Sequence, residues 1–159
     1  MQNDPLTDNT RLEGSADEAL ARTLIDSFTT ELSIATHAFV ADEPADAGGN
    51  GLGPSPYDLL SAALASCTSM TLKMYATRKS WPMKSATVRV RHQKTHIKDC
   101  LDCESGGSRV DEFRREIELE GDLTDEQRRR LLDIAEKCPV HRTLGSEIRI
   151  TTALAPGNG

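Results

Sequence analysis

The sequence predicts an α+β fold, and three features of the chain support this prediction. Segments with strand-type alternation lie before and after one long apolar helix pattern at residues 56–76. A second helix pattern follows, and a further alternating segment comes after it. Strand and helix patterns therefore do not alternate one by one along the chain, as they would in a doubly wound parallel sheet.

Residues 1–18 are predicted to form a mobile tail, and residues 19–159 to form a single domain. The tail is polar and acidic and has no apolar period. A chain of 159 residues is long enough to bury one core without a metal or a disulfide staple.

The first part of the domain is predicted to form a β-hairpin that leads into a loop. A strand near Leu24 and Ile25 would pair with strand structure that starts at Thr30. The residues that suggest this second stretch are Leu32, Ile34, His37, Phe39 and Val40. Residues 42–56 are rich in glycine and proline, which predicts a loop before the long helix.

The long helix carries its own start and stop signals. Ser55 is a suitable N-cap, and Pro56 suits the first turn because it needs no N–H donor there. Arg78 and Lys79 suit the C-terminal end, and Pro82 ends the helix. Its apolar face is predicted from residues at helical spacing, namely Leu60, Ala63, Leu64, Cys67, Met70, Thr71 and Met74.

The later elements follow from alternation and from one capping motif. Two strands are predicted where every second residue faces inward, the first with Ala86, Val88 and Val90, the second with Phe113, Arg115, Ile117 and Leu119. Thr124 and Gln127 have capping-box spacing, which predicts a helix that ends near Lys137. Its inward residues would be Leu131, Ile134 and Ala135. Residues 147–154 alternate again and predict a last strand.

Two cysteines in unlike settings are the main candidate functional residues. Cys67 lies within the long helix, and Cys138 precedes a proline that would open a short helix. Free N–H groups and the helix dipole would make Cys138 the more acidic thiol. A thiolate reduces a peroxide by attacking its O–O bond, and a second thiol converts the resulting sulfenic acid to a disulfide. The alternative is that Cys67 is a small buried hydrophobe and that Cys138 packs against Ile134.

The segments GPSPYDLLSAALASCTSM (53–70) and KCPVHRTL (137–144) resemble the paired cysteine segments of the OsmC/Ohr family, the osmotically inducible and organic hydroperoxide resistance proteins. The resemblance is to the OsmC-like subgroup and extends roughly over residues 20–154. It implies an intertwined homodimer, in which antiparallel sheets from both chains wrap two long central helices and the active sites lie at the subunit interface.

The same resemblance implies a cysteine-based peroxidase that takes organic hydroperoxides. Cys67 would be the peroxidatic residue, which forms a sulfenic acid, and Cys138 the resolving residue. An external dithiol or lipoyl-type reductant would reopen the disulfide, and no resident cofactor is expected.

The sequence departs from the family at the residues that activate the thiol. Peroxidase members supply an arginine from a loop near the N-terminus, held by a glutamate directly after the proline that opens the long helix. Here Tyr57 follows that proline, the acid is displaced to Asp58, and residues 23–30 contain no arginine. At ~100° per residue, Asp58 falls about 180° around the helix from Cys67, and Tyr57 about 80°. The candidate activating residues are therefore Arg22 and Arg142, with His141 as a candidate proton carrier.

A second constellation, H-x3-H-x3-C-x2-C, consists of His92, His96, Cys100 and Cys103. Two histidines on one strand face and a Cys-x2-Cys turn are ligands that zinc accepts. The cysteines are alternatively a redox-active or disulfide pair, or exposed thiols without an assigned role.

Charge and composition limit the partners. The net charge of −6 and the scattered basic residues give no footprint for nucleic acid. No apolar stretch is long enough for membrane insertion, and the N-terminus does not resemble a signal peptide, so a cytoplasmic location is expected. Besides a peroxidase of the oxidative stress response, two functions stay open. One is a non-enzymatic protein that binds an apolar ligand at the dimer interface, and the other is a redox or metal sensor that uses Cys100 and Cys103.

Overall fold

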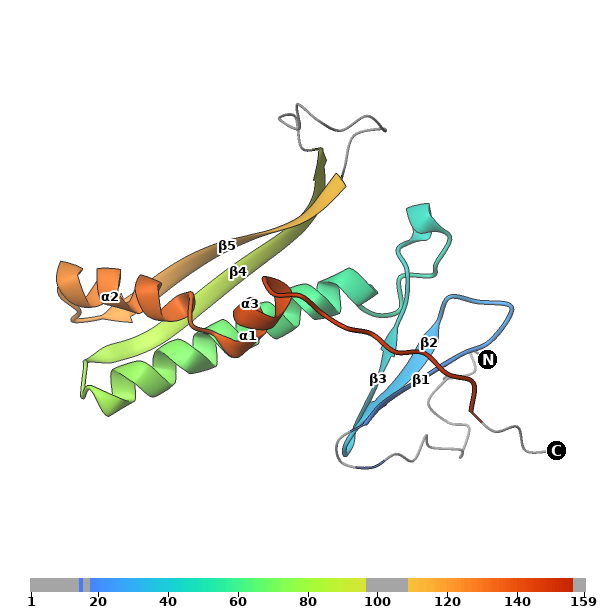
Figure 1. Ribbon diagram of the computed structural model, residues 1–159, viewed down its shortest axis with the longest axis horizontal. Coiled ribbons are helices and arrows are strands. Elements are labelled where there is room, and N and C mark those ends of the chain that lie inside the picture. The colour runs from blue at the N-terminus through green and yellow to red at the C-terminus, as the bar shows by residue number, and fades with distance from the viewer. Residues whose placement is uncertain (1–14, 16–17, 97–108, 156–159) are drawn as a thin grey trace. The chain divides into compact units, whose positions relative to one another are not determined.

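The computed structural model describes residue 15, residues 18–96 and residues 109–155 (Figure 1). These residues belong to two compact units, which divide between Leu60 and Ser61. The predicted tail, residues 1–18, lies outside the described residues apart from Ser15 and Glu18, and the single domain stays a prediction.

The first unit contains a three-stranded antiparallel sheet in the order β1-β2-β3. Its strands are β1 (Ala19–Thr23), β2 (Thr30–Ile34) and β3 (His37–Ala41). The predicted strand near Leu24 and Ile25 needs correction, because β1 ends at Thr23, opposite Thr30 in the register. Both apolar residues lie in the exposed connection to β2, so their hydrophobicity did not indicate the position of the strand.

A buried aspartate organises the loop between β3 and the long helix. The carboxylate of Asp42 accepts hydrogen bonds from the backbone N–H groups of Glu43, Asn50 and Leu52 and from the hydroxyl of Thr29. Burial opposes ionisation of Asp42, but these donors outweigh it and lower its pKa. The loop also contains a short 3-10 helix, η1 (Ala45–Ala47).

The helix α1 spans Pro56–Arg78 and begins as its caps predict. The N–H of Asp58 donates to Ser55 Oγ at 3.2 Å, and the N–H of Ser55 donates to the Asp58 carboxylate at 2.9 Å. Its buried residues form one i, i+4 stripe of Leu64, Thr68, Leu72 and Ala76. The predicted apolar face was therefore wrong at four positions that are exposed in the single chain, namely Leu60, Ala63, Met70 and Met74. Apolar residues occur nearly all round this helix, so their spacing did not single out one face.

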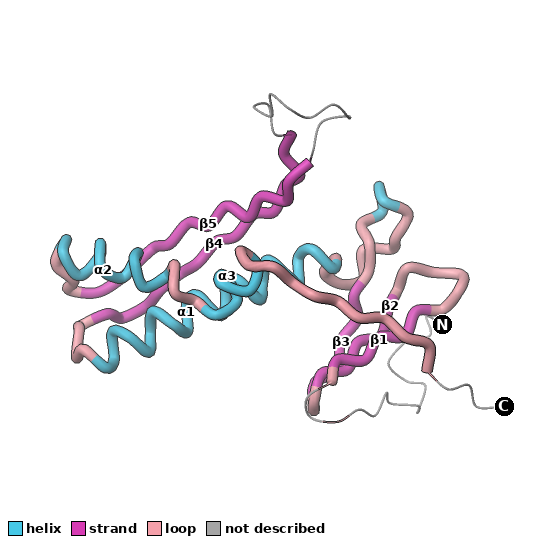
Figure 2. The backbone as a smooth tube through the Cα atoms, in the orientation of Figure 1, coloured by secondary structure: helices cyan, strands magenta, loops and turns pink. Residues whose placement is uncertain are grey.

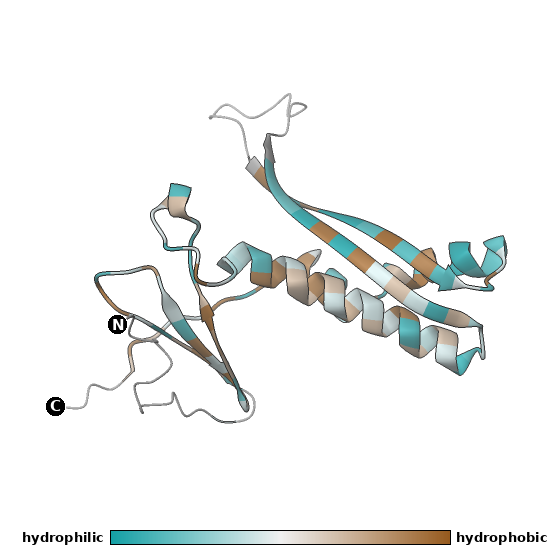
Figure 3. Cartoon of the chain, turned by 180° about the vertical axis from the view of Figure 1, so that it is seen from behind, coloured by the Kyte–Doolittle hydropathy of each residue, from teal (hydrophilic) through white to brown (hydrophobic). Residues whose placement is uncertain are grey.

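The second unit contains the antiparallel pair β4 (Met83–His96) and β5 (Arg109–Gly121). Figure 3 shows hydrophobic and hydrophilic bands alternating along both strands, as one buried face requires. The helix α2 (Asp125–Ala135) begins with the predicted capping box of Thr124 and Gln127. The core joins α1, α2 and the residues before α2 through Leu72, Ala76, Leu123, Leu131, Ile134 and Ala135.

The short helix α3 (Pro139–Leu144) follows, with Cys138 at its N-cap. The strand predicted at residues 147–154 is wrong, because this segment is drawn as a loop in Figure 2 and pairs with neither sheet. Alternation alone does not make a strand, since each strand needs a neighbouring backbone to bond.

The α+β prediction with antiparallel sheets is confirmed. Within the described ranges, no helix is both long enough and apolar enough to cross a membrane. The homodimer stays a prediction.

Candidate active site

The second unit brings Cys67 and Cys138 together. Cys67 lies near the middle of α1 and is half-buried, whereas Cys138 is 0% exposed at the junction of α2 and α3. Both cysteines are free, and the side chain of each shifts the pKa of the other, which places the two sulfurs next to each other. Two sulfurs that are distant in sequence thus form a dithiol in which one can react with the other.

The two thiols have opposite acidities. Burial raises the pKa of Cys67, and its hydrogen bond to Cys138 raises this pKa further because the Cys67 proton is then shared. Burial also disfavours the charged form of Cys138, but hydrogen bonds from Cys67, the His141 N–H and Thr68 outweigh it and lower the pKa of Cys138. The singly ionised pair therefore carries its negative charge on Cys138 and its proton on Cys67.

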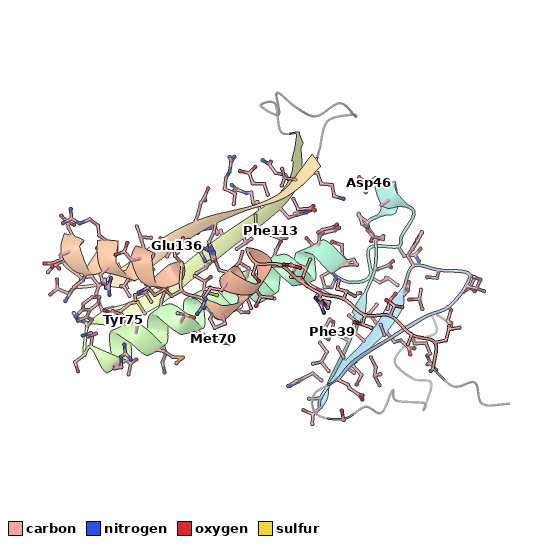
Figure 4. All side chains as sticks on the ribbon, in the orientation of Figure 1. Phe39, Asp46, Met70, Tyr75, Phe113 and Glu136 are labelled. Carbon is pink, nitrogen blue, oxygen red and sulfur yellow. The ribbon has the colours of Figure 1, made fainter. Side chains whose placement is uncertain are left out.

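A buried arginine lies beside this dithiol. The side chain of Arg115, on β5, is only 9% exposed. Its Nη1 donates to Thr68 Oγ1 at 3.0 Å and to the Ala135 carbonyl oxygen at 3.2 Å. Its Nη2 donates to Glu136 Oε1 at 2.7 Å. Figure 4 labels Glu136, which directly follows α2. Arg115 thus connects β5, α1 and the junction that carries Cys138.

The sequence contains one signal that points to Arg115. Arg115 has the inward phase of the alternating strand that also contains Phe113, Ile117 and Leu119. A charged residue at an inward position must find partners, because burying an unpaired charge is costly. Arg22 and Arg142 are the cations that the sequence predicts, and the alternation of β5 alone does not assign Arg115 a role.

The predicted activating residues have other observed partners or surroundings. Arg22 forms an ion pair with Glu31 on the neighbouring strand β2, at 2.7 Å. Asp58 caps α1, and its hydrogen bonds with Ser55 lower its pKa. Tyr57 is exposed in the first turn, and Arg142 is exposed on α3. The catalytic roles of these residues stay predictions.

His141 lies near the dithiol. Its Nε2 is 3.3 Å from Glu136 Oε2, so one carboxylate contacts both His141 and Arg115. The backbone N–H of His141 is also one of the groups that lower the pKa of Cys138. The role of His141 as a proton carrier stays a prediction.

The second constellation is only partly described. His92 is 2.8 Å from Asp111 and packs against the ring of Phe113, with 4.8 Å between ring centroids. The side chain of His96 and both Cys100 and Cys103 lie outside the described residues. Among the side chains that the structure does describe, no group of three His, Cys, Asp or Glu residues could hold a metal ion. The zinc and redox interpretations of this cluster stay open.

Comparison with known proteins places this site in a family. The family model described as OsmC-like protein matches residues 48–153, which contain both cysteines. No curated protein matches the chain.

Solved structures share the fold. A Psychrobacter arcticus protein assigned to osmotic stress and detoxification responses is 23% identical, with a TM-score of 0.59 over 79% of this chain and 85% of that one. An organic hydroperoxide resistance protein from Elizabethkingia anophelis is 19% identical, with a TM-score of 0.60 over 79% and 84%. The organic hydroperoxide resistance protein OhrB of Bacillus subtilis is 18% identical, with a TM-score of 0.56 over 79% and 87%.

Proposed function

Because the chain belongs to the OsmC-like protein family, we propose that it is a thiol-dependent peroxidase that reduces organic hydroperoxides in oxidative stress defence. The observation that carries this proposal is the proximity of the thiols of Cys67 and Cys138, each of which shifts the pKa of the other. A half-buried and a fully buried thiol that lie side by side on two different elements have the arrangement that sulfenic acid formation and resolution require.

The exposures of the two cysteines support their division of roles. A hydroperoxide must reach the sulfur that attacks it, and Cys67 is half-buried while Cys138 is fully buried. Cys67 is therefore the residue that meets the peroxide. Cys138 needs to reach only Cys67, which it already contacts.

The reaction proceeds in two steps from the singly ionised dithiol. In the first, the Cys67 sulfur attacks the terminal peroxide oxygen while its proton passes to the Cys138 sulfur. The O–O bond breaks, the alkoxide takes a proton from solvent and leaves as an alcohol, and Cys67 becomes a sulfenic acid. In the second, Cys138 loses its proton and attacks the Cys67 sulfur, which forms the S–S bond and expels the hydroxyl group as water. An external dithiol then reduces the disulfide by exchange.

The proposed setting is the cytoplasm, where dithiol reductants keep such a pair reduced. The proposed assembly is a homodimer, and the proposed reductant is a dithiol of the lipoyl type. The exposed Met70 and Met74 on α1 support a partner subunit, because large apolar side chains on a long helix favour burial (Figure 4 labels Met70).

The direct test uses two serine variants and a reagent that traps sulfenic acids. Cys67→Ser is expected to abolish turnover of cumene hydroperoxide with a lipoyl reductant. Cys138→Ser is expected to undergo one oxidation, with dimedone trapped at Cys67, and no catalytic cycle. Full turnover by Cys67→Ser would contradict the proposal. Dimedone at Cys138 instead of Cys67 in the wild-type protein would reverse the roles.

A further inference from the structure

We infer that Arg115 is the positioning cation of this site. Resting on the proposed peroxidase function, Arg115 acts through the hydroxyl of Thr68 to keep Cys138 ready to accept the proton of Cys67 and then to attack its sulfenic acid. Arg115 does not touch the sulfurs in any hydrogen bond of the described residues, so its effect passes through Thr68.

The guanidinium of Arg115 is fixed by three partners, one on α1 and two at the C-terminal end of α2. They are the hydroxyl of Thr68 on α1, the carbonyl oxygen of Ala135 at the end of α2, and the carboxylate of Glu136. The Ala135 carbonyl also accepts the N–H of Cys138 at 3.2 Å. Arg115 and the backbone of Cys138 therefore share an acceptor, which ties the position of the cation to that of the cysteine.

The hydroxyl of Thr68 must choose between two acceptors. It has one proton, which it donates to the Leu64 carbonyl at 2.7 Å, as threonines within helices commonly do. Its second acceptor is the sulfur of Cys138, whose pKa the Thr68 side chain lowers as a hydrogen-bond donor. Nη1 of Arg115 occupies a lone pair of the same oxygen, which leaves the proton free to turn from Leu64 to a Cys138 thiolate.

The charge around the dithiol is uneven, and this favours an anion there. The Arg115 side chain is 9% exposed, whereas that of its partner Glu136 is 63% exposed. Water screens the carboxylate more than the buried guanidinium, so a net positive field remains on the buried side, next to Thr68. The bond from Thr68 is one of the contacts that lower the pKa of Cys138.

This arrangement supplies a cation that the segment before β2 does not contain. Residues 23–30 include no arginine, and Arg22 is paired with Glu31. Arg115 supplies a positive charge from β5 and acts on the resolving cysteine.

The test is a carbon NMR titration of the labelled Cys Cβ atoms in the reduced full-length protein, assigned with single Cys→Ser variants. Thr68→Val removes the hydroxyl, and Arg115→Gln removes the charge. Each is expected to raise the pKa of Cys138 by about one unit, the size expected for a lost hydrogen bond to a charged group. Thr68→Ser keeps the hydroxyl and is expected to titrate like the wild-type protein. Arg115→Lys keeps the positive charge but loses the planar guanidinium that donates from two nitrogens. It is expected to shift the pKa of Cys138 less than Arg115→Gln does.

The outcomes separate this inference from the proposed function, because the titration uses no peroxide. An unchanged Cys138 titration in folded Thr68→Val overturns the inference, even if the wild-type protein forms the disulfide with peroxide. A shifted titration supports the inference. If the wild-type protein then does not react with peroxide, the proposed peroxidase function is wrong, but the inference about Arg115 still holds. Circular dichroism checks the fold of each variant. If Arg115→Gln does not fold, Arg115→Lys tests the cation in its place, and Thr68→Val with its serine control tests the hydroxyl through which Arg115 acts.

Discussion

The β1–β2 pair and the β4–β5 pair each carry an arginine that binds a glutamate at 2.7 Å, yet the two arginines differ in surroundings. Arg22 is 36% exposed and pairs across the strand, whereas Arg115 is 9% exposed and binds residues of two helical elements as well. The buried residues of the first unit are few, and two of them, Ser33 and Asp42, are polar. The second unit has a connected apolar core. Burial against an apolar core therefore distinguishes Arg115 from Arg22. The distance of the ion pair, which is the same for both, does not.

The largest expected effect separates the two regions by their cores. Leu131→Ala should lower the free energy of unfolding by about 2–5 kcal/mol, because Leu131 is fully buried in the apolar cluster. Leu24→Ala, in the exposed connection after β1, should change it by less than about 0.5 kcal/mol. Urea denaturation at one protein concentration measures both. Equal losses would show that the first unit is packed as well as the second.

The next effect separates the two arginines directly. Arg115→Met should slow peroxide-driven formation of the Cys67–Cys138 disulfide at neutral pH about tenfold, the equivalent of one pKa unit on Cys138. Arg22→Met is the matched control and should leave that rate unchanged, since Arg22 is paired with Glu31. Rapid quenching with an alkylating reagent, followed by mass analysis, gives both rates. A loss in Arg22→Met alone would place the activating cation on β1.

The pH dependence sharpens the same comparison. The lowered pKa of Cys138 means that its thiolate is present below the ordinary thiol value of 9.0. The rate of disulfide formation should therefore rise with pH and level off before pH 9.0 in the wild-type protein and in Arg22→Met. In Arg115→Met the plateau should move upward. A wild-type rate that still climbs through pH 9.0 would show that the site does not stabilise this thiolate.

The smallest effect concerns the outer face of the same β4–β5 pair. Arg89 pairs with Glu118 at 3.1 Å, and both side chains are more than half exposed. Arg89→Ala should change stability by no more than about 0.5 kcal/mol, as is usual for exposed pairs, and should not affect the thiols. Thermal unfolding and the disulfide rate together check this. A loss as large as that of Arg115→Met would mean that exposure does not distinguish the two faces.

Local signals allowed much of the fold to be predicted. Ser55 and Pro56 fixed the start of α1, and Thr124 with Gln127 fixed the start of α2, because caps act within one turn. The inward residues of β4 and β5 followed from alternation. The strand at residues 147–154 failed, because a strand depends on a distant partner that periodicity does not reveal.

The candidate site was only half predictable for the same reason. Cys67 and Cys138 stood out by residue type and by the motifs around them. Arg115 did not, because its importance comes from Thr68, Ala135 and Glu136, which are distant from it in sequence. The inward phase of Arg115 on β5 was the available clue. Only the fold shows which groups form hydrogen bonds with its guanidinium.

The most direct test of the proposed peroxidase is disulfide mapping after one equivalent of cumene hydroperoxide is added to the fully reduced protein. We expect rapid loss of two thiols and a peptide pair that joins Cys67 to Cys138. Cys67 and Cys138 unreacted over minutes would contradict this expectation, and so would a disulfide between Cys100 and Cys103 with Cys67 still reduced.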